Sequence, residues 1–147
     1  MAKNTLRGVY ESGCGDARNW GIDDIRLVTG WHRLERGTVN VRLEVPHTLR
    51  QPPDFHLARE QRSPEYGHDD EDLDFERCFL VLPGGARVRA LIARTSRNFW
   101  GGAVLEVMAE EHLRTSYELK DGDGIDVEVW IGPNAAAEAE YETGYAI

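Results

Sequence analysis

The sequence is dominated by short segments in which apolar and polar residues alternate. In residues 38–45, TVNVRLEV, every second residue is apolar and falls on one face of an extended strand, because successive side chains of a strand point to opposite sides. Further strand-like segments occupy residues 5–12, 77–82, 86–94, 103–109 and 125–131. Helical spacing is limited to residues 21–34 and 110–119, so the βαβ alternation of a parallel sheet is absent. These patterns predict a mostly β fold: a small antiparallel barrel of six strands with two short helices.

The size and composition are typical of one globular domain. The chain has 147 residues, of which 41% are hydrophobic and 29% charged, and we expect residues 1–147 to form a single domain. Residues 46–76 are rich in proline and charge and are predicted to be a long surface excursion. No membrane span or signal-peptide core is visible, which favours a cytoplasmic location. The sequence leaves the oligomeric state open, and a monomer is compatible with it.

Charge and cysteine content narrow the classes of partner and site. The formal charge of −9 repels nucleic acid, although it does not exclude anionic small ligands that are held by local groups. Cys14 and Cys78 lack paired C-x-x-C spacing, so free thiols are expected rather than a disulfide or a zinc site. The acidic segment 68–74 does not have the spacing of an EF-hand loop and is interpreted as a solvated loop. No serine or metal hydrolase motif is present.

Two segments carry weak signals of phosphate chemistry. Residues 11–20, ESGCGDARNW, follow a predicted strand and contain two glycines two apart, which favours either a phosphate-binding loop or a tight turn. No G-K-[ST] follows, and the βαβ unit of a dinucleotide-binding fold is missing. In residues 37–40, GTVN, Thr38 and Asn40 point to the same side of a strand. Their oxygens either satisfy a turn or hold Mg²⁺ together with phosphates.

Taken in order along the chain, three segments resemble the archaeal-type CTP-dependent riboflavin kinase family. LRGVYESGCGDARNW is similar to its opening strand and Gly-rich nucleotide loop, and GTVNVRL to its G-T-L-N-[VI]-x-L segment. LEVMAEEHLRTSYELKDGDGIDVEV is similar to its closing block, L-E-[IV]-[IL]-A-P-x-x-L-R-x-x-x-x-L-x-D-G-D-x-[IV]. The resemblance implies a six-stranded cradle-loop β-barrel that transfers the γ-phosphoryl group of CTP to the 5′-hydroxyl of riboflavin, giving FMN and CDP.

The resemblance also assigns roles to individual residues. Thr38 and Asn40 match the family's Mg²⁺ ligands, Glu106 and Asn98 fall where the flavin is contacted, and Glu106 is expected to orient the reacting hydroxyl. The alternative is that Glu106 has no role in the reaction and is an outward-facing strand residue. The positions that match the nucleotide contacts are Cys14, Gly15, Asp16, Ala17, Arg18, Asn19, Glu111, His112, Leu113 and Arg114.

The chain departs from the family pattern in three places, one of which is the nucleotide loop, which lacks the aromatic residue usually found after it unless Trp20 substitutes one position later. The segment R-P-x-x-T-x-H is RTSRNFW here, residues 94–100, so Asn98 stands in place of threonine and the bulkier Trp100 in place of histidine. The A-P step of the closing block is Ala109–Glu110. These changes keep two alternatives open: a kinase with a different polyol acceptor, and a regulatory module that binds flavin or nucleotide without turnover. A DNA-binding relative of the same barrel is disfavoured by the acidic charge.

Overall fold

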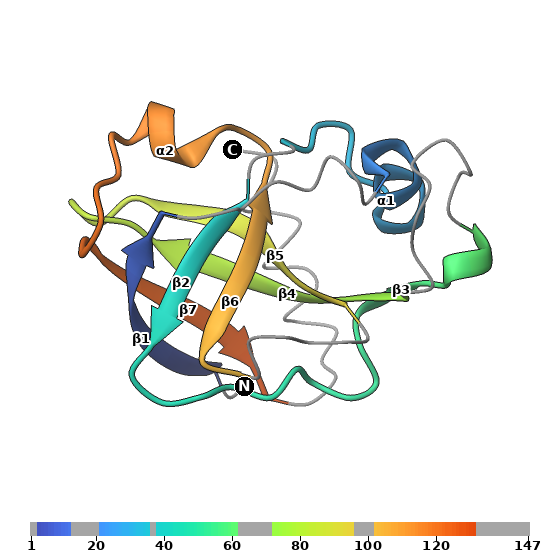
Figure 1. Ribbon diagram of the computed structural model, residues 1–147, viewed down its shortest axis with the longest axis horizontal. Coiled ribbons are helices and arrows are strands. Elements are labelled where there is room, and N and C mark those ends of the chain that lie inside the picture. Colours follow the sequence, from blue (N-terminus) through green and yellow to red (C-terminus); the bar gives the residue numbers. More distant parts are fainter. Residues whose placement is uncertain (1–2, 13–20, 36–37, 62–71, 96–101, 132–147) are drawn as a thin grey trace.

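The strands form one antiparallel sheet that closes on itself (Figure 1). The computed structural model describes residues 3–12, 21–35, 38–61, 72–95 and 102–131. The strands are β1 (Lys3–Glu11), β2 (Val39–Leu43), β3 (Phe55–Leu57), β4 (Leu73–Val81), β5 (Arg87–Thr95), β6 (Val104–Ala109) and β7 (Gly124–Trp130). Their order is β3-β4-β5-β6-β2-β1-β7, and a β4–β7 pairing closes a ring of six. The predicted six-stranded antiparallel barrel is confirmed.

Strand β3 is an addition to that ring. It pairs with the first part of β4 (Phe55 opposite Phe75), whereas β7 pairs with the last part (Leu80 opposite Val127). The two short pairings therefore share one edge of a long strand. Both β3 and the first residues of β4 fall within the predicted surface excursion, as does a 3₁₀ turn at Arg59–Gln61. Sequence reasoning did not predict these strand residues, because three residues of strand are too short to give a periodic signal.

The barrel buries apolar side chains on its inside and on part of its outside. Val39, Val41 and Leu43 point inward with Leu105 and Ile92, on the face that their alternation predicts. A second cluster lies outside the barrel wall, where side chains of α1 and its C-terminal flank cover β4, β5 and β6. Its members include Ile25, Trp31, Phe75, Phe79, Leu91 and Met108. Burial on both faces explains why residues 77–82 form a nearly continuous apolar run.

The two helices are shorter than their predicted segments. Helix α1 spans Ile22–Thr29 and ends at Gly30, whose φ of 76° lies in the left-handed region that favours glycine. The predicted continuation to residue 34 is therefore wrong, and Trp31 instead turns into the outer cluster. Helix α2 spans only Leu113–Ser116 and lies over one end of the barrel (Figure 1). Within the described residues, no helix is long and apolar enough to cross a membrane.

A close backbone contact gives a test of the fold. A Cβ on Gly102 would lie 2.4 Å from the carbonyl oxygen of His47, whose backbone N–H donates to the Gly102 carbonyl at 2.9 Å. The His47 ring in turn contacts buried Glu76 at 3.0 Å. We expect Gly102→Ala to lower the free energy of unfolding by about 2–3 kcal/mol, measured by urea denaturation. Gly124→Ala is the matched control, because its Cβ meets nothing within 4 Å. Equal stability of the two variants would contradict this interpretation.

Candidate functional site

Three polar residues lie side by side across neighbouring strands on the outside of the barrel. Asn40 of β2 is directly opposite Glu11 of β1 and Glu106 of β6. Residues directly opposite each other project to the same face of a sheet. Since Val39 and Val41 fill the barrel, this face is the outer one. Glu106 thus faces away from the barrel interior, but it shares a row with Asn40.

The two predicted metal ligands have oxygens that need a partner. Thr38 directly precedes β2 and shares the face of Asn40 by alternation. Thr38 Oγ1 and Asn40 Oδ1 are both fully buried, and neither has a hydrogen-bond partner among the described residues. Buried polar atoms in native proteins are nearly always paired. Two neutral oxygens of this kind would suit Mg²⁺ if phosphate oxygens supplied the negative charge.

The two carboxylates that flank Asn40 have opposite electrostatic environments. Glu11 receives two hydrogen bonds from Arg42, at 2.6 and 3.0 Å, and these lower the pKa of its carboxyl group. Burial raises the pKa of Glu106. Glu11 is therefore held as a paired anion, whereas Glu106 is a poorly solvated carboxylate that gains from a hydrogen-bond donor. Sequence reasoning gave no role to Glu11 or Arg42, because their proximity depends on the strand register.

The start of α2 brings together the second set of predicted ligand residues. His112 caps the helix, where its Nδ1 accepts a hydrogen bond from the Thr115 backbone N–H at 3.3 Å. Leu113 is buried in the barrel core, whereas Glu111 and Arg114 are exposed. Of the four predicted residues in this segment, one is therefore buried and the other three are exposed.

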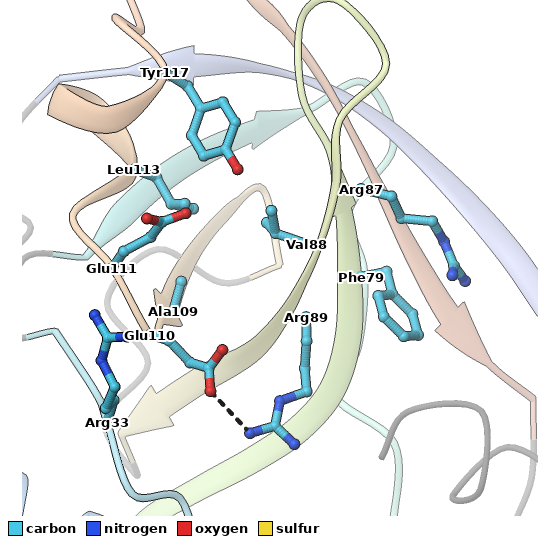
Figure 2. Close-up of a pocket in the computed structure, with 10 residues that line it drawn as sticks. All are labelled: Arg33, Phe79, Arg87, Val88, Arg89, Ala109, Glu110, Glu111, Leu113 and Tyr117. Carbon is cyan, nitrogen blue, oxygen red and sulfur yellow. Dashed lines mark hydrogen bonds and ion pairs between the residues drawn. The ribbon is translucent and has the colours of Figure 1, made fainter. Parts of the chain in front are cut away.

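A pocket of about 510 Å³ lies beside α2, between the helix and the first residues of β5 (Figure 2). Glu111 and Leu113 belong to the predicted nucleotide set and line this pocket. Arg33, Arg87, Arg89 and Glu110 also line it, and sequence reasoning gave none of them a role. Charged residues on the outer side of β5 look like solvent-facing residues in a strand pattern, yet Arg89 is only 5% exposed.

Aromatic rings and carboxylates hold the arginines of the pocket. The Arg89 guanidinium lies 3.9 Å from the centre of the Trp31 ring, and its Nη2 is 3.3 Å from Glu110 Oε1. Arg87 lies over the Phe79 ring at 3.7 Å. Burial raises the pKa of Glu110, and the nearby arginines Arg89 and Arg33 partly oppose this shift. Stacking and ion pairing fix these side chains before any ligand binds.

A comparison with known protein families matches the part of the chain that contains most of the residues described above. Residues 34–129, more than half of the chain, match the family named for CTP-dependent riboflavin kinase and described as DUF120, a domain of unknown function. The chain belongs to this family. No curated protein matches the chain significantly.

The part that matches the CTP-dependent riboflavin kinase family includes Thr38, Asn40, Glu106 and residues 111–114, and the Gly-rich loop precedes it. The predicted nucleotide contacts Cys14, Gly15, Asp16, Ala17, Arg18 and Asn19 lie outside the described residues, as does the predicted flavin contact Asn98. In the described part of the chain, no three His, Cys, Asp or Glu residues form a metal-binding group. Buried Cys78 is a free thiol there, as its sequence predicts.

Within the acidic segment 68–74, the described aspartates contact a histidine. The His56 ring is 2.5 Å from Asp74 and 3.8 Å from Asp72. The Asp74 hydrogen bond raises the pKa of His56. These half-exposed side chains link β3 to the start of β4, and both carboxylates contact the His56 ring of the same chain.

Proposed function

We propose that this protein is a CTP-dependent kinase that transfers the γ-phosphoryl group of CTP to the 5′-hydroxyl of riboflavin, giving FMN and CDP. The observation that carries the proposal is the row of polar groups on β2 and β6. The buried oxygens of Thr38 and Asn40 have no hydrogen-bond partner among the described residues, and Asn40 is directly opposite Glu106 in a chain of the CTP-dependent riboflavin kinase family. A flavin-binding module without turnover has no need of the Thr38 and Asn40 oxygens.

Each residue of this row has a distinct task in the proposed reaction. Thr38 and Asn40 would hold Mg²⁺, which would supply positive charge to offset the negative charge that develops on the transferring phosphoryl group. Glu106 accepts a hydrogen bond from the 5′-hydroxyl and aims its oxygen at the γ-phosphorus. The new O–P bond forms as the bond to the bridging oxygen breaks, CDP leaves, and the hydroxyl proton passes to Glu106. Phosphoryl transfer is mainly positioning and charge neutralisation, so these few groups are sufficient.

The proposal predicts a nucleotide-dependent product. The full chain is incubated with riboflavin, Mg²⁺ and one of the four nucleoside triphosphates, and FMN is separated by chromatography. We expect FMN with CTP, and none when Mg²⁺ is replaced by a chelator. The proposal is wrong if no nucleotide yields FMN while calorimetry still detects riboflavin or CTP binding. A regulatory module would then replace it, or a kinase for another polyol, which the departures at residues 98–100 would favour.

A further inference from the structure

Arg42 lies beside the row of polar residues on the outer face of the barrel, yet the proposed transfer gives it no task. It follows Asn40 by two positions in β2, so both side chains project to the same face. Its direct neighbour on β1 is Val9, but its guanidinium bonds diagonally to Glu11: Nε donates to Oε2 at 2.6 Å and Nη2 to Oε1 at 3.0 Å. This contact draws the guanidinium along the strand toward the level of Asn40.

The pairing with Glu11 leaves part of the Arg42 guanidinium available to a ligand. Both hydrogen bonds use the edge formed by Nε and Nη2, and the donors on Nη1 have no acceptor among the described residues. The Arg42 side chain is 51% exposed, so an anion can reach them. A guanidinium that is held by a carboxylate on one edge therefore presents its other edge in a fixed direction, which suits phosphate oxygens.

The surroundings of the pair are those assigned to the nucleotide. Glu11 is the last residue of β1, shortly before the Gly-rich segment, and Asn40 is a proposed metal ligand. The intervening Ser12 is fixed, because its backbone N–H and its hydroxyl both donate to Asp121, at 2.7 and 2.9 Å. The Arg42 guanidinium is thus anchored where the metal-binding strand and the fixed end of β1 meet.

Charge balance on this face requires a cation besides the metal. Glu11 and Glu106 are carboxylates directly opposite Asn40, and the oxygens of Thr38 and Asn40 are neutral. A triphosphate carries more negative charge than one Mg²⁺ offsets, and kinases and GTPases commonly add an arginine or a lysine. Arginine stays protonated at every physiological pH.

We propose that Arg42 is a further catalytic residue, which binds the phosphate oxygens of CTP through its Nη1 edge and offsets the charge that develops during the transfer. Glu11 is the positioning residue that holds the guanidinium in place. The inference rests on the proposed function for the identity of the nucleotide. The segment G-T-L-N-[VI]-x-L that GTVNVRL resembles leaves the position of Arg42 open, so this role concerns this chain.

Removal of Arg42 and its chemical rescue test the assignment. We expect Arg42→Ala to lower kcat for FMN formation by about 100-fold and to raise the KM for CTP by about 10-fold, with the KM for riboflavin unchanged. Millimolar guanidinium chloride should restore part of the rate, because the free ion can occupy the vacated position. Arg42→Lys keeps the charge without the fork and should be intermediate. The melting temperature should hardly change, since exposed ion pairs add little stability.

Arg26→Ala is the matched control. Arg26 also belongs to an exposed ion pair, with Asp23 of α1, and its removal should give neither a loss of rate nor a rescue. Glu11→Asp tests the positioning role, because it keeps the charge and shortens the side chain. We expect it to lower kcat by about 10-fold in the wild type and to cause no further loss in Arg42→Ala, since Glu11 acts through Arg42.

Several results would overturn the assignment. Wild-type kcat and CTP KM in Arg42→Ala would refute it, and equal rises in the KM of both substrates without rescue would assign Arg42 to the fold. Additive losses in the double variant would remove the positioning role of Glu11. Absence of CTP binding by the wild type, measured by calorimetry, would overturn both this inference and the proposed function. CTP binding without FMN formation would overturn only the proposed function, and an about 10-fold weaker CTP affinity of Arg42→Ala would then still support the phosphate contact.

Discussion

Replacement of Asn40 by alanine is expected to lower the rate of FMN formation by at least about 100-fold, corresponding to about 3 kcal/mol of transition-state stabilisation. Asn40 Oδ1 is one of two buried oxygens without a partner among the described residues, and its proposed task is to hold the metal that accompanies the phosphates. The measurement is FMN formation as a function of Mg²⁺ concentration. We expect the concentration of Mg²⁺ required for half-maximal rate to rise as the maximal rate falls.

The same substitution should leave the fold intact. An unpartnered buried carbonyl contributes desolvation cost without a compensating hydrogen bond, so its removal should keep the melting temperature constant or raise it. Thr38→Val removes the second oxygen while preserving the shape of the side chain, and we expect a similar loss of rate. Asn4→Ala, at an exposed position of β1, is the matched control and should behave as the wild type. A large fall in the melting temperature of Asn40→Ala would show that the oxygen serves the fold instead.

The predictability of the barrel has a simple physical basis. Residues 38–45 alternate strictly because one side of β2 packs inside the barrel and the other does not, so the sequence itself records the two faces. Strand β4 does not alternate in this way, because Phe75 and Phe79 are buried outside the barrel while Cys78 and Leu80 are buried inside it. Its apolar run could be identified as a strand, but its first residue and its pairing with β3 could not.

The candidate site was only partly predictable from the sequence. The pair Thr38 and Asn40 could be recognised from the sequence because the two residues are two positions apart, so that one local conformation fixes their common direction. The proximity of Glu106 to Asn40 joins residues of two different strands, and their direct opposition depends on the β2–β6 register. Arg89 is harder still, since its burial results from packing against Trp31, 58 positions earlier in the chain. A sequence pattern of charged residues on a strand indicates solvent exposure, and tertiary contacts override it here.

Replacement of Glu106 by glutamine should distinguish the effect of this carboxylate on the stability of the fold from its effect on the rate of the reaction. Glutamine has a similar shape but cannot take the hydroxyl proton, so we expect FMN formation to fall by about 10²–10⁴-fold. In the wild type, only the ionised form of Glu106 accepts the proton. Burial raises its pKa above the ordinary 4.5, so activity should decline on acidification at a higher pH than for an exposed glutamate. Rate profiles against pH with saturating substrates measure both effects.

The stability of the same variant should change in the opposite direction. A carboxyl group whose pKa is raised by folding binds its proton more tightly in the folded than in the unfolded chain, so ionisation at neutral pH destabilises the fold. Glu106→Gln removes that cost and should melt at a higher temperature than the wild type at pH 7. The difference should shrink as the pH falls through the raised pKa and disappear below about 4, where both states of the wild type are protonated. Glu44→Gln, with the same change of charge at an exposed position, should show no such difference. A lower melting temperature for Glu106→Gln at pH 7 would mean that the carboxylate serves the fold, and its assignment to the reacting hydroxyl would lose its physical basis.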